Sequence, residues 1–223
     1  MSRPVALLLV IAVVLTVPAA LLSWYLSNGL QRDLRARGAS VRVFAGPLGV
    51  FTGRIWRLQF FVRGAAFEGG TVREIRGDLR GVRLHLPRAA GGHLTVRAIS
   101  AGSAVVILDE TDVQRALANA RDIQGARVRL DDGTARITGT VLVVNSSFPV
   151  EVTARLAIDD GRALLLRVET LNISGIAIPR GLSNALMTAV NPLLLAPQAP
   201  VPLRFTGLEV DDGRAVIRGV PAP

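Results

Sequence analysis

The sequence contains no cysteine and no lysine, and each absence narrows the chemistry of the chain. Without cysteine there is no disulfide, no thiolate metal ligand and no cysteine nucleophile. Without lysine, all 26 basic residues are Arg, whose planar guanidinium can hold a phosphate through two hydrogen bonds. The formal net charge of +9 therefore favours an anionic partner. Aromatic residues make up only 4% of the chain, which argues against a nucleic acid recognised by base stacking.

Histidine is also scarce, because only His85 and His93 are present. This bears on Ser183, since residues 181–185 loosely match the turn that carries the nucleophile of a hydrolase. Such a hydrolase needs a His after the Ser, so we interpret Ser183 as a polar residue in the first turns of a helix. The sequence also lacks a phosphate-binding glycine loop and metal-ligand spacing. We therefore predict a protein that is not an enzyme and needs no metal or cofactor.

The longest apolar run lies at the N-terminus. Val5–Leu26 contains no charged residue, and as a helix it would be about 33 Å long, enough to cross a bilayer core. Trp24 and Tyr25 stand at its far end, where amphipathic rings favour the membrane interface. Small residues fit a signal-peptidase site before Ala20, but the apolar run continues beyond it, which favours an uncleaved signal anchor over a cleaved signal peptide.

We accordingly divide the chain into a signal anchor or signal peptide over residues 1–27, a linker or short helix over residues 28–39, and a domain over residues 40–220. The arginines that follow the apolar run would, by charge counting alone, place this domain in the cytoplasm. A short basic start before an apolar run is, however, typical of an export signal. We predict a domain outside the cytoplasm, held at the cell membrane or exported after cleavage.

From Val41 onward the dominant period of apolar residues is two, which is typical of strands with one buried face. In residues 54–63 the apolar positions are Trp56, Leu58, Phe60 and Val62, and residues 148–158 alternate in the same way. In residues 75–86 the apolar phase moves from odd to even positions at Gly81. This shift predicts a bulge or bend in a long strand.

A repeated hairpin motif is the strongest internal signal. The segments VRLDDGTARI (128–137), LAIDDGRALL (156–165) and LEVDDGRAVI (208–217) each place Asp-Asp-Gly between two apolar runs. Asp and Gly tolerate the positive φ angles that a tight hairpin requires. Acid pairs can also bind calcium, but no neighbouring carboxylates complete a cage here. We therefore predict three hairpin turns.

Two segments depart from the strand pattern. Asp109–Ala120 has apolar residues at helical spacing, and Thr111 with Gln114 fits a capping box. Residues 179–190 are the second predicted helix, which Pro192 ends. The apolar, proline-rich segment 192–203 that follows must be buried, lipid-facing or partner-facing. Together these features predict an α+β fold: a long, curved antiparallel β-sheet wrapped around two short helices, preceded by an N-terminal transmembrane or signal helix.

The order of these features resembles a known family. The relevant segments are Thr52–Arg54, residues 72–84, residues 105–118, the three Asp-Asp-Gly hairpins, residues 178–186 and residues 204–219. They resemble the LmeA-like phospholipid-binding proteins of bacterial cell envelopes, over roughly residues 40–220. The resemblance implies a non-catalytic phospholipid-binding protein whose curved sheet and helices are similar to those of tubular lipid-binding proteins.

We expect acyl chains in an apolar groove and arginines near the head groups of an anionic phospholipid in the membrane. The predicted lining residues are Trp56, Leu58, Phe60, Val113, Leu117, Leu182, Leu186 and Val190, and the predicted head-group residues are Arg54, Arg80 and Arg83. Apolar residues of this kind also form filled cores. The alternative is therefore a membrane-anchored scaffold with a filled core, which docks an envelope protein through Leu193–Leu195.

Overall fold

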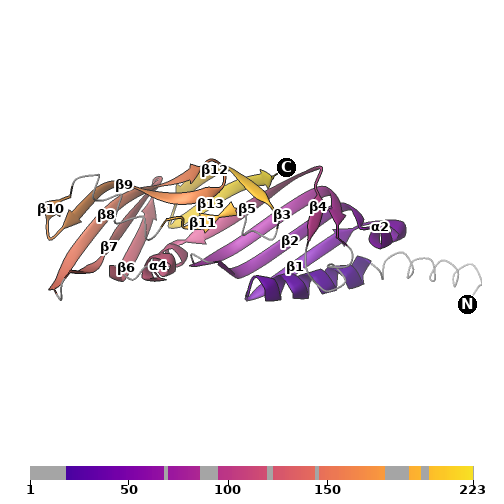
Figure 1. Cartoon of the computed structure of the whole chain (residues 1–223), viewed down its shortest axis with the longest axis horizontal. Helices are drawn as coiled ribbons and strands as arrows, with labels where there is room; N and C mark the ends of the chain where they lie inside the picture. Colours follow the sequence, from indigo (N-terminus) through magenta and orange to yellow (C-terminus); the bar gives the residue numbers. More distant parts are fainter. Residues whose placement is uncertain are drawn as a thin grey trace, which may run out of the picture.

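The computed structural model describes residues 19–67, 70–85, 95–119, 123–143, 146–178, 191–196 and 201–222. In these ranges the chain consists mainly of antiparallel strands, with a helix over residues 19–33 and two shorter helices. The strands form two sheets, which follow one another along the long axis of the molecule (Figure 1). The predicted α+β class is confirmed, but two open sheets take the place of the single long sheet.

Sheet A contains seven of the described strands in the order β1-β2-β3-β5-β13-β12, and β4 also pairs with β3. Each of its neighbouring pairs is antiparallel. The bounds are β1 Gly38–Phe44, β2 Arg54–Phe67, β3 Gly70–Leu84, β4 Val96–Ala98, β5 Ala101–Asp109, β12 Leu203–Asp211 and β13 Arg214–Pro221. A short helix, α2, covers Pro47–Thr52 between β1 and β2.

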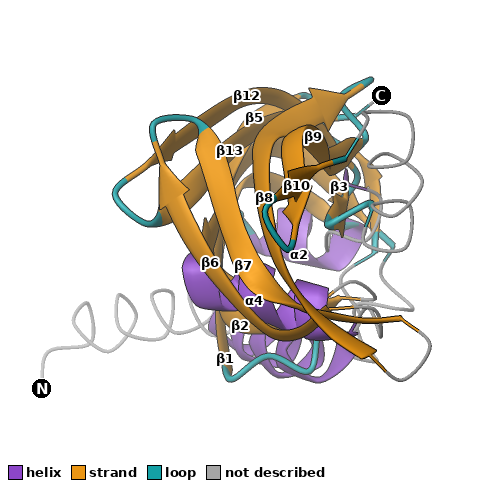
Figure 2. Cartoon of the chain, turned by 90° about the vertical axis from the view of Figure 1, so that its left-hand side faces the viewer, coloured by secondary structure: helices purple, strands orange, loops and turns teal. Residues whose placement is uncertain are grey.

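Sheet B contains six described strands in the order β10-β9-β8-β7-β6, and β11 also pairs with β9. The bounds are β6 Ile123–Asp131, β7 Thr134–Val143, β8 Ser146–Asp159, β9 Ala163–Ile173, β10 Ile176–Ala177 and β11 Leu194–Leu195. Helix α4, Glu110–Asn119, carries the chain from sheet A to sheet B, and β12 returns it to sheet A. Helix α4 packs against β3 and β5 of sheet A and against β6 of sheet B, and the curved sheets are seen end-on in Figure 2.

The long β2–β3 hairpin contains two glycines with positive φ, Gly64 in β2 and Gly81 in β3. The bend at Gly81 is the one that the phase shift in the sequence predicts. Gly81 has φ of 59°, and the buried residues of β3 pass from Leu79 to Val82 across it. The paired strand bends at the same level, so that Ile55 and Leu58 are buried while the residues between them are exposed. Trp56 is therefore 71% exposed, and the prediction that it shares a face with Leu58 and Phe60 is wrong.

All three Asp-Asp-Gly hairpins are confirmed. In each of them the second Asp and the Gly have positive φ, between 41° and 78°. The hairpins β6–β7 and β12–β13 close on two residues, whereas β8–β9 has one residue more. These turns also join the two sheets. The Gly133 N–H donates to the Val210 carbonyl oxygen and the Gly213 N–H donates to the Leu130 carbonyl oxygen, each at 3.1 Å.

The N-terminal helix forms part of the domain core. Leu26 and Leu30 are at most 1% exposed, and the hydroxyl groups of Ser23 and Ser27 accept hydrogen bonds from the N–H groups of Val43 and Val41. This helix therefore packs against β1 of sheet A, whereas α4 lies where the two sheets meet (Figure 1). Among the described residues no helix is both long and apolar enough to span a membrane. Most of the predicted anchor precedes residue 19 and lies outside them.

The predicted helix at residues 179–190 also lies outside the described residues, and with it Leu182, Leu186 and Val190. The described part of the proline-rich segment is buried. Leu193 and Leu194 are 7% and 5% exposed, and β11 pairs with β9. A scaffold that docks its partner through these leucines would first have to release them from sheet B.

Candidate functional site

Four predicted lining residues belong to one filled core. Leu58 and Phe60 of β2 and Val113 and Leu117 of α4 are each at most 3% exposed, and all belong to the same apolar cluster. The side chains that surround them already occupy the space that an acyl chain would need. Their contribution to lipid binding stays a prediction, and in this structure they pack the core between sheet and helix.

The predicted head-group arginines lie on the other face of sheet A. Arg54, Arg80 and Arg83 are exposed, whereas Leu79, Val82 and Leu84 between and beside them are buried. Arg54 stands directly opposite Arg83 in the β2–β3 register. The structure thus brings these arginines close to one another, but it does not bring them to the core residues Leu58 and Phe60.

An ion pair on this outer face should make the stability of the protein depend on pH. The Arg57 guanidinium donates two hydrogen bonds to the Asp78 carboxylate through Nε, at 2.8 and 3.1 Å. These bonds lower the pKa of Asp78 to about 2 from 3.8. The folded state therefore holds this proton less tightly than the unfolded chain does. The stabilisation by Asp78 is complete above pH 4 and is lost as the pH falls from about 4 to about 2.

We expect Asp78→Asn to destabilise the protein slightly at neutral pH, because solvent screens a pair this exposed. The difference in unfolding free energy between the variant and the original chain should vanish near pH 2. Urea unfolding followed by circular dichroism across this pH range would measure it. A difference that is independent of pH would show that the ion pair contributes nothing to stability.

A polar pocket of about 510 Å³ lies between the end of the N-terminal helix and the start of α4. Its wall combines four arginines with three carboxylates. The lining residues are Arg37, Arg63, Gly64, Thr71, Arg73, Glu74, Asp109, Asp112 and Arg115. They come from the segment after the N-terminal helix, from β2 and β3, and from the β5–α4 junction, so this pocket exists only in the folded chain.

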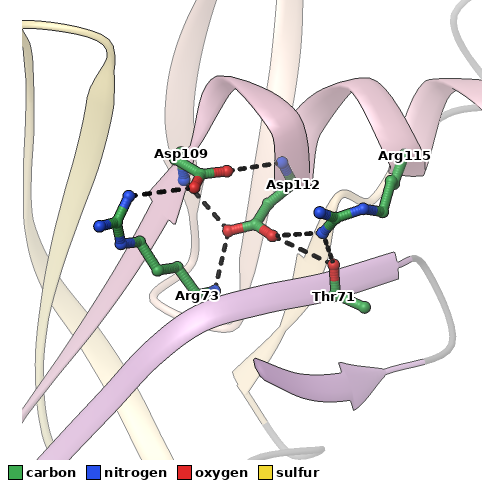
Figure 3. Close-up of polar contacts among 5 residues, drawn as sticks. All are labelled: Thr71, Arg73, Asp109, Asp112 and Arg115. Carbon is green, nitrogen blue, oxygen red and sulfur yellow. Dashed lines mark hydrogen bonds and ion pairs between the residues drawn. The ribbon is translucent and has the colours of Figure 1, made fainter. Parts of the chain in front are cut away.

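The buried carboxylate of Asp112 organises one side of this pocket (Figure 3). Asp112 is 4% exposed. Its Oδ2 accepts the N–H of Arg73 at 2.8 Å and of Asp109 at 3.1 Å, and its Oδ1 accepts Arg115 at 2.9 Å and Thr71 at 3.1 Å. Burial raises the pKa of Asp112. One carboxylate thus fixes the first turn of α4 to the start of β3.

Asp109 and Asp112 together form the N-terminal cap of α4. The Asp112 N–H donates to the Asp109 carboxylate at 2.8 Å, and the Asp109 N–H donates back to Asp112 at 3.1 Å. This is a reciprocal capping box formed by two Asp residues. The capping box predicted from Thr111 and Gln114 is therefore wrong. The helix begins two residues earlier, because the last residue of β5 serves as its cap.

Two arginines of the pocket have no carboxylate partner among the described residues. Arg73 pairs with Asp109, and Arg115 pairs with Asp112. Arg37 and Arg63 make no such pair; the Arg63 guanidinium lies over the Phe61 ring at 5.0 Å. The Arg37 N–H donates to the Arg63 carbonyl oxygen at 3.0 Å, which holds the two residues side by side. No local sequence pattern distinguishes these two arginines from the others, since they lie 26 positions apart in separate segments.

The arrangement of side chains in this pocket is better suited to binding an anion than to acid–base catalysis. Two unpaired guanidinium groups can each donate two hydrogen bonds to one phosphate. The carboxylates of Asp109 and Asp112 are occupied by the cap and by Arg73 and Arg115, and Glu74 pairs with Arg76, so the three do not form a free acid–base pair. Within the described part of the chain, no group of His, Asp and Glu residues is arranged to hold a metal ion.

Comparisons with known proteins identify the family. A family model described as LmeA-like phospholipid-binding matches residues 16–220, nearly the whole chain. No curated protein and no solved structure gives a significant match. The match begins at residue 16 and includes the whole described N-terminal helix, whose buried leucines are part of the core. The chain therefore belongs to the LmeA-like phospholipid-binding family.

Proposed function

We propose that this protein binds an anionic phospholipid without catalysis at the bacterial cell membrane, and that the lipid phosphate lies in the pocket between the two helices. The observation that carries the proposal is the pair of unpartnered arginines, Arg37 and Arg63, in a pocket of about 510 Å³. Bound phosphate would pair with two arginines that form no ion pair with a carboxylate of the described chain, since Glu74, opposite Arg63, pairs with Arg76. The N-terminal apolar run would keep the domain at the membrane, on its extracytoplasmic side.

Two half-buried apolar side chains, on the same strand and helix as pocket residues, support a path for the acyl chains of the lipid. Phe67, a few residues beyond Arg63 on β2, and Ala116, next to Arg115 on α4, are only half-buried and pack against the apolar core. We propose that the acyl chains of a lipid whose phosphate contacts Arg63 run along these side chains.

A scaffold function is favoured by one observation, the filled core. Leu58 and Leu117 are 0% exposed, so the described inner face offers no open groove at these residues. A scaffold needs no bound lipid, and the two functions therefore differ in a measurable way. A phospholipid-binding protein and a scaffold would both lie at the membrane, but only the phospholipid-binding protein would bind lipid through Arg37 and Arg63.

The test compares two double variants that remove the same charge. Arg37→Gln with Arg63→Gln should weaken phospholipid binding by about two orders of magnitude, because each charge-assisted hydrogen bond contributes ~1.5–3 kcal/mol. Arg127→Gln with Arg129→Gln, two exposed residues of β6 in sheet B, should leave binding unchanged. The full chain in detergent would be titrated with short-chain phosphatidylglycerol, with bound lipid counted by native mass spectrometry. Equal losses in both variants, or no lipid bound by the original chain, would refute the proposed site.

A further inference from the structure

Exposed apolar side chains gather at one end of the molecule. Of the nine large hydrophobic residues that are exposed in the described chain, seven belong to three neighbouring segments: the N-terminal helix, the β1–α2 region and the start of β2. We name four of them the apolar tip: Phe44, Leu48, Phe51 and Trp56, which are 45%, 80%, 70% and 71% exposed. Soluble monomers rarely leave such a group open to water, so it indicates an interaction surface.

The backbone holds the apolar tip outward. Helix α2 begins at Pro47 and ends at Gly53, which has φ of 70° and donates its N–H to the carbonyl oxygens of Gly49 and Val50. The three-residue spacing of Leu48 and Phe51 places them on one side of this helix. A Cβ atom on Gly49 would lie 2.5 Å from the Arg54 carbonyl oxygen, so α2 packs closely on β2. The tip is thus a formed surface and not a loose loop.

Arginines outnumber carboxylates around the apolar tip, where Asp78 of β3 pairs with Arg57. Between Asp33 and Glu68 the sequence contains six arginines and no carboxylate. Arg54 and Arg83 face each other on β2 and β3, just beyond α2, and neither has an ion-pair partner among the described residues. Like charges placed directly opposite destabilise a sheet. Apolar side chains bordered by unpaired arginines are complementary to an anionic lipid surface, where apolar groups enter the interface and arginines meet phosphates.

The course of the chain points to the same surface. The uncharged run Val5–Leu26 leads into the N-terminal helix, and residue 19, where the described helix begins, lies at the α2 end of the molecule (Figure 1). Ser23 bonds the N–H of Val43, so the start of this helix is joined to β1 next to Phe44. Leu21, Trp24 and Tyr25 of the helix are exposed as well. An apolar run that enters a bilayer would bring the apolar tip to its surface.

We propose that the apolar tip docks on the surface of an anionic bilayer, with Trp56 and Phe51 among the upper acyl chains and Arg54 and Arg83 among the phosphates. This surface is separate from the pocket of Arg37 and Arg63, and it does not require a lipid bound there. It orients the elongated domain so that sheet B extends away from the membrane.

Fluorescence tests this directly, because the chain has only two tryptophans. Trp24→Phe leaves Trp56 as the only tryptophan of the full chain. In vesicles of phosphatidylcholine and phosphatidylglycerol, its emission should shift to the blue and lose most of its intensity when the phosphatidylcholine is brominated near the head-group end of its acyl chains. Leu48→Asp with Phe51→Asp, both at exposed positions, should abolish this quenching. Arg54→Gln with Arg83→Gln should weaken docking by about fivefold for each arginine.

A tryptophan at the opposite end serves as the matched control. Ile176 is 69% exposed and belongs to β10, which lies at the far end of the molecule (Figure 1). Ile176→Trp, in a chain without Trp24 and Trp56, should be quenched by acrylamide from solution and not by brominated lipid. The proposal fails if the two ends are quenched alike by brominated lipid. It fails equally if Trp56 stays open to acrylamide, or is shielded from acrylamide without contacting lipid, since a protein would then cover the tip.

Discussion

Replacing Gly77 with alanine should destabilise the protein by about 2–3 kcal/mol, because the added methyl group collides with a buried ring. Gly77 of β3 stands opposite Phe60 of β2, and the Phe60 ring lies over it. A Cβ atom on Gly77 would be 2.1 Å from the Cε1 atom of this ring. Phe60 is 3% exposed, so the ring has no free space into which it can turn.

Thermal unfolding of the full chain in detergent, followed by circular dichroism, would measure this effect. Gly38→Ala is the matched control, since a Cβ atom there meets nothing within 4 Å, and it should change stability little. In a Phe60→Ala background the cost of Gly77→Ala should largely disappear. If the cost is the same in both backgrounds, the ring is not its cause, and Phe60 is free to serve another role, including contact with lipid.

Replacing Asp112 with alanine should cost about 2–4 kcal/mol. The substitution removes the acceptor of the Arg73 and Asp109 N–H groups and of the Thr71 hydroxyl, all at the edge of a buried site. Leaving such groups without partners costs ~1–3 kcal/mol each, although water can reach part of the pocket and reduces the sum. The loss of the helix cap adds to it.

The capping arrangement supplies the control for Asp112. Thr111 is the exposed residue that the sequence pattern nominates as the cap, and Thr111→Ala should change the unfolding free energy by less than about 0.5 kcal/mol. Asp112→Asn keeps one acceptor oxygen and should have an intermediate effect. Urea unfolding of the three variants would rank them. A Thr111 variant as unstable as the Asp112 variant would contradict the Asp109–Asp112 cap.

Local patterns predicted the β-structure well, since they follow directly from backbone geometry. Alternating apolar residues identified β2 and β8, and Asp-Asp-Gly identified three turns, because few residues other than Asp, Asn and Gly adopt positive φ readily. The shift of the apolar phase also predicted the bend at Gly81. The effect of this bend on β2 could not be predicted, because Trp56 leaves the buried face only when β2 and β3 are paired.

The pocket could not be predicted because it depends on long-range contacts. Arg37 reaches Arg63 through a backbone hydrogen bond, and α4 reaches β3 through Asp112. No pattern within a single segment reports either contact. The predicted head-group residues Arg54 and Arg83 were recognised by their charge alone. The structure places them on the outer face, beside the apolar tip that we propose to dock on a bilayer.

A photocrosslinking phospholipid tests most directly whether the lipid phosphate lies in the pocket of Arg37 and Arg63. The full chain would be irradiated with a phosphatidylglycerol that carries a photoreactive group on its head group, and the adducts would be mapped by mass spectrometry of peptides. We predict adducts in the segment from Arg63 to Arg73 and in the first turns of α4, and their loss when Arg37 and Arg63 are replaced by glutamine. Adducts found only at the apolar tip or in the N-terminal apolar run would contradict a head-group site between the two helices.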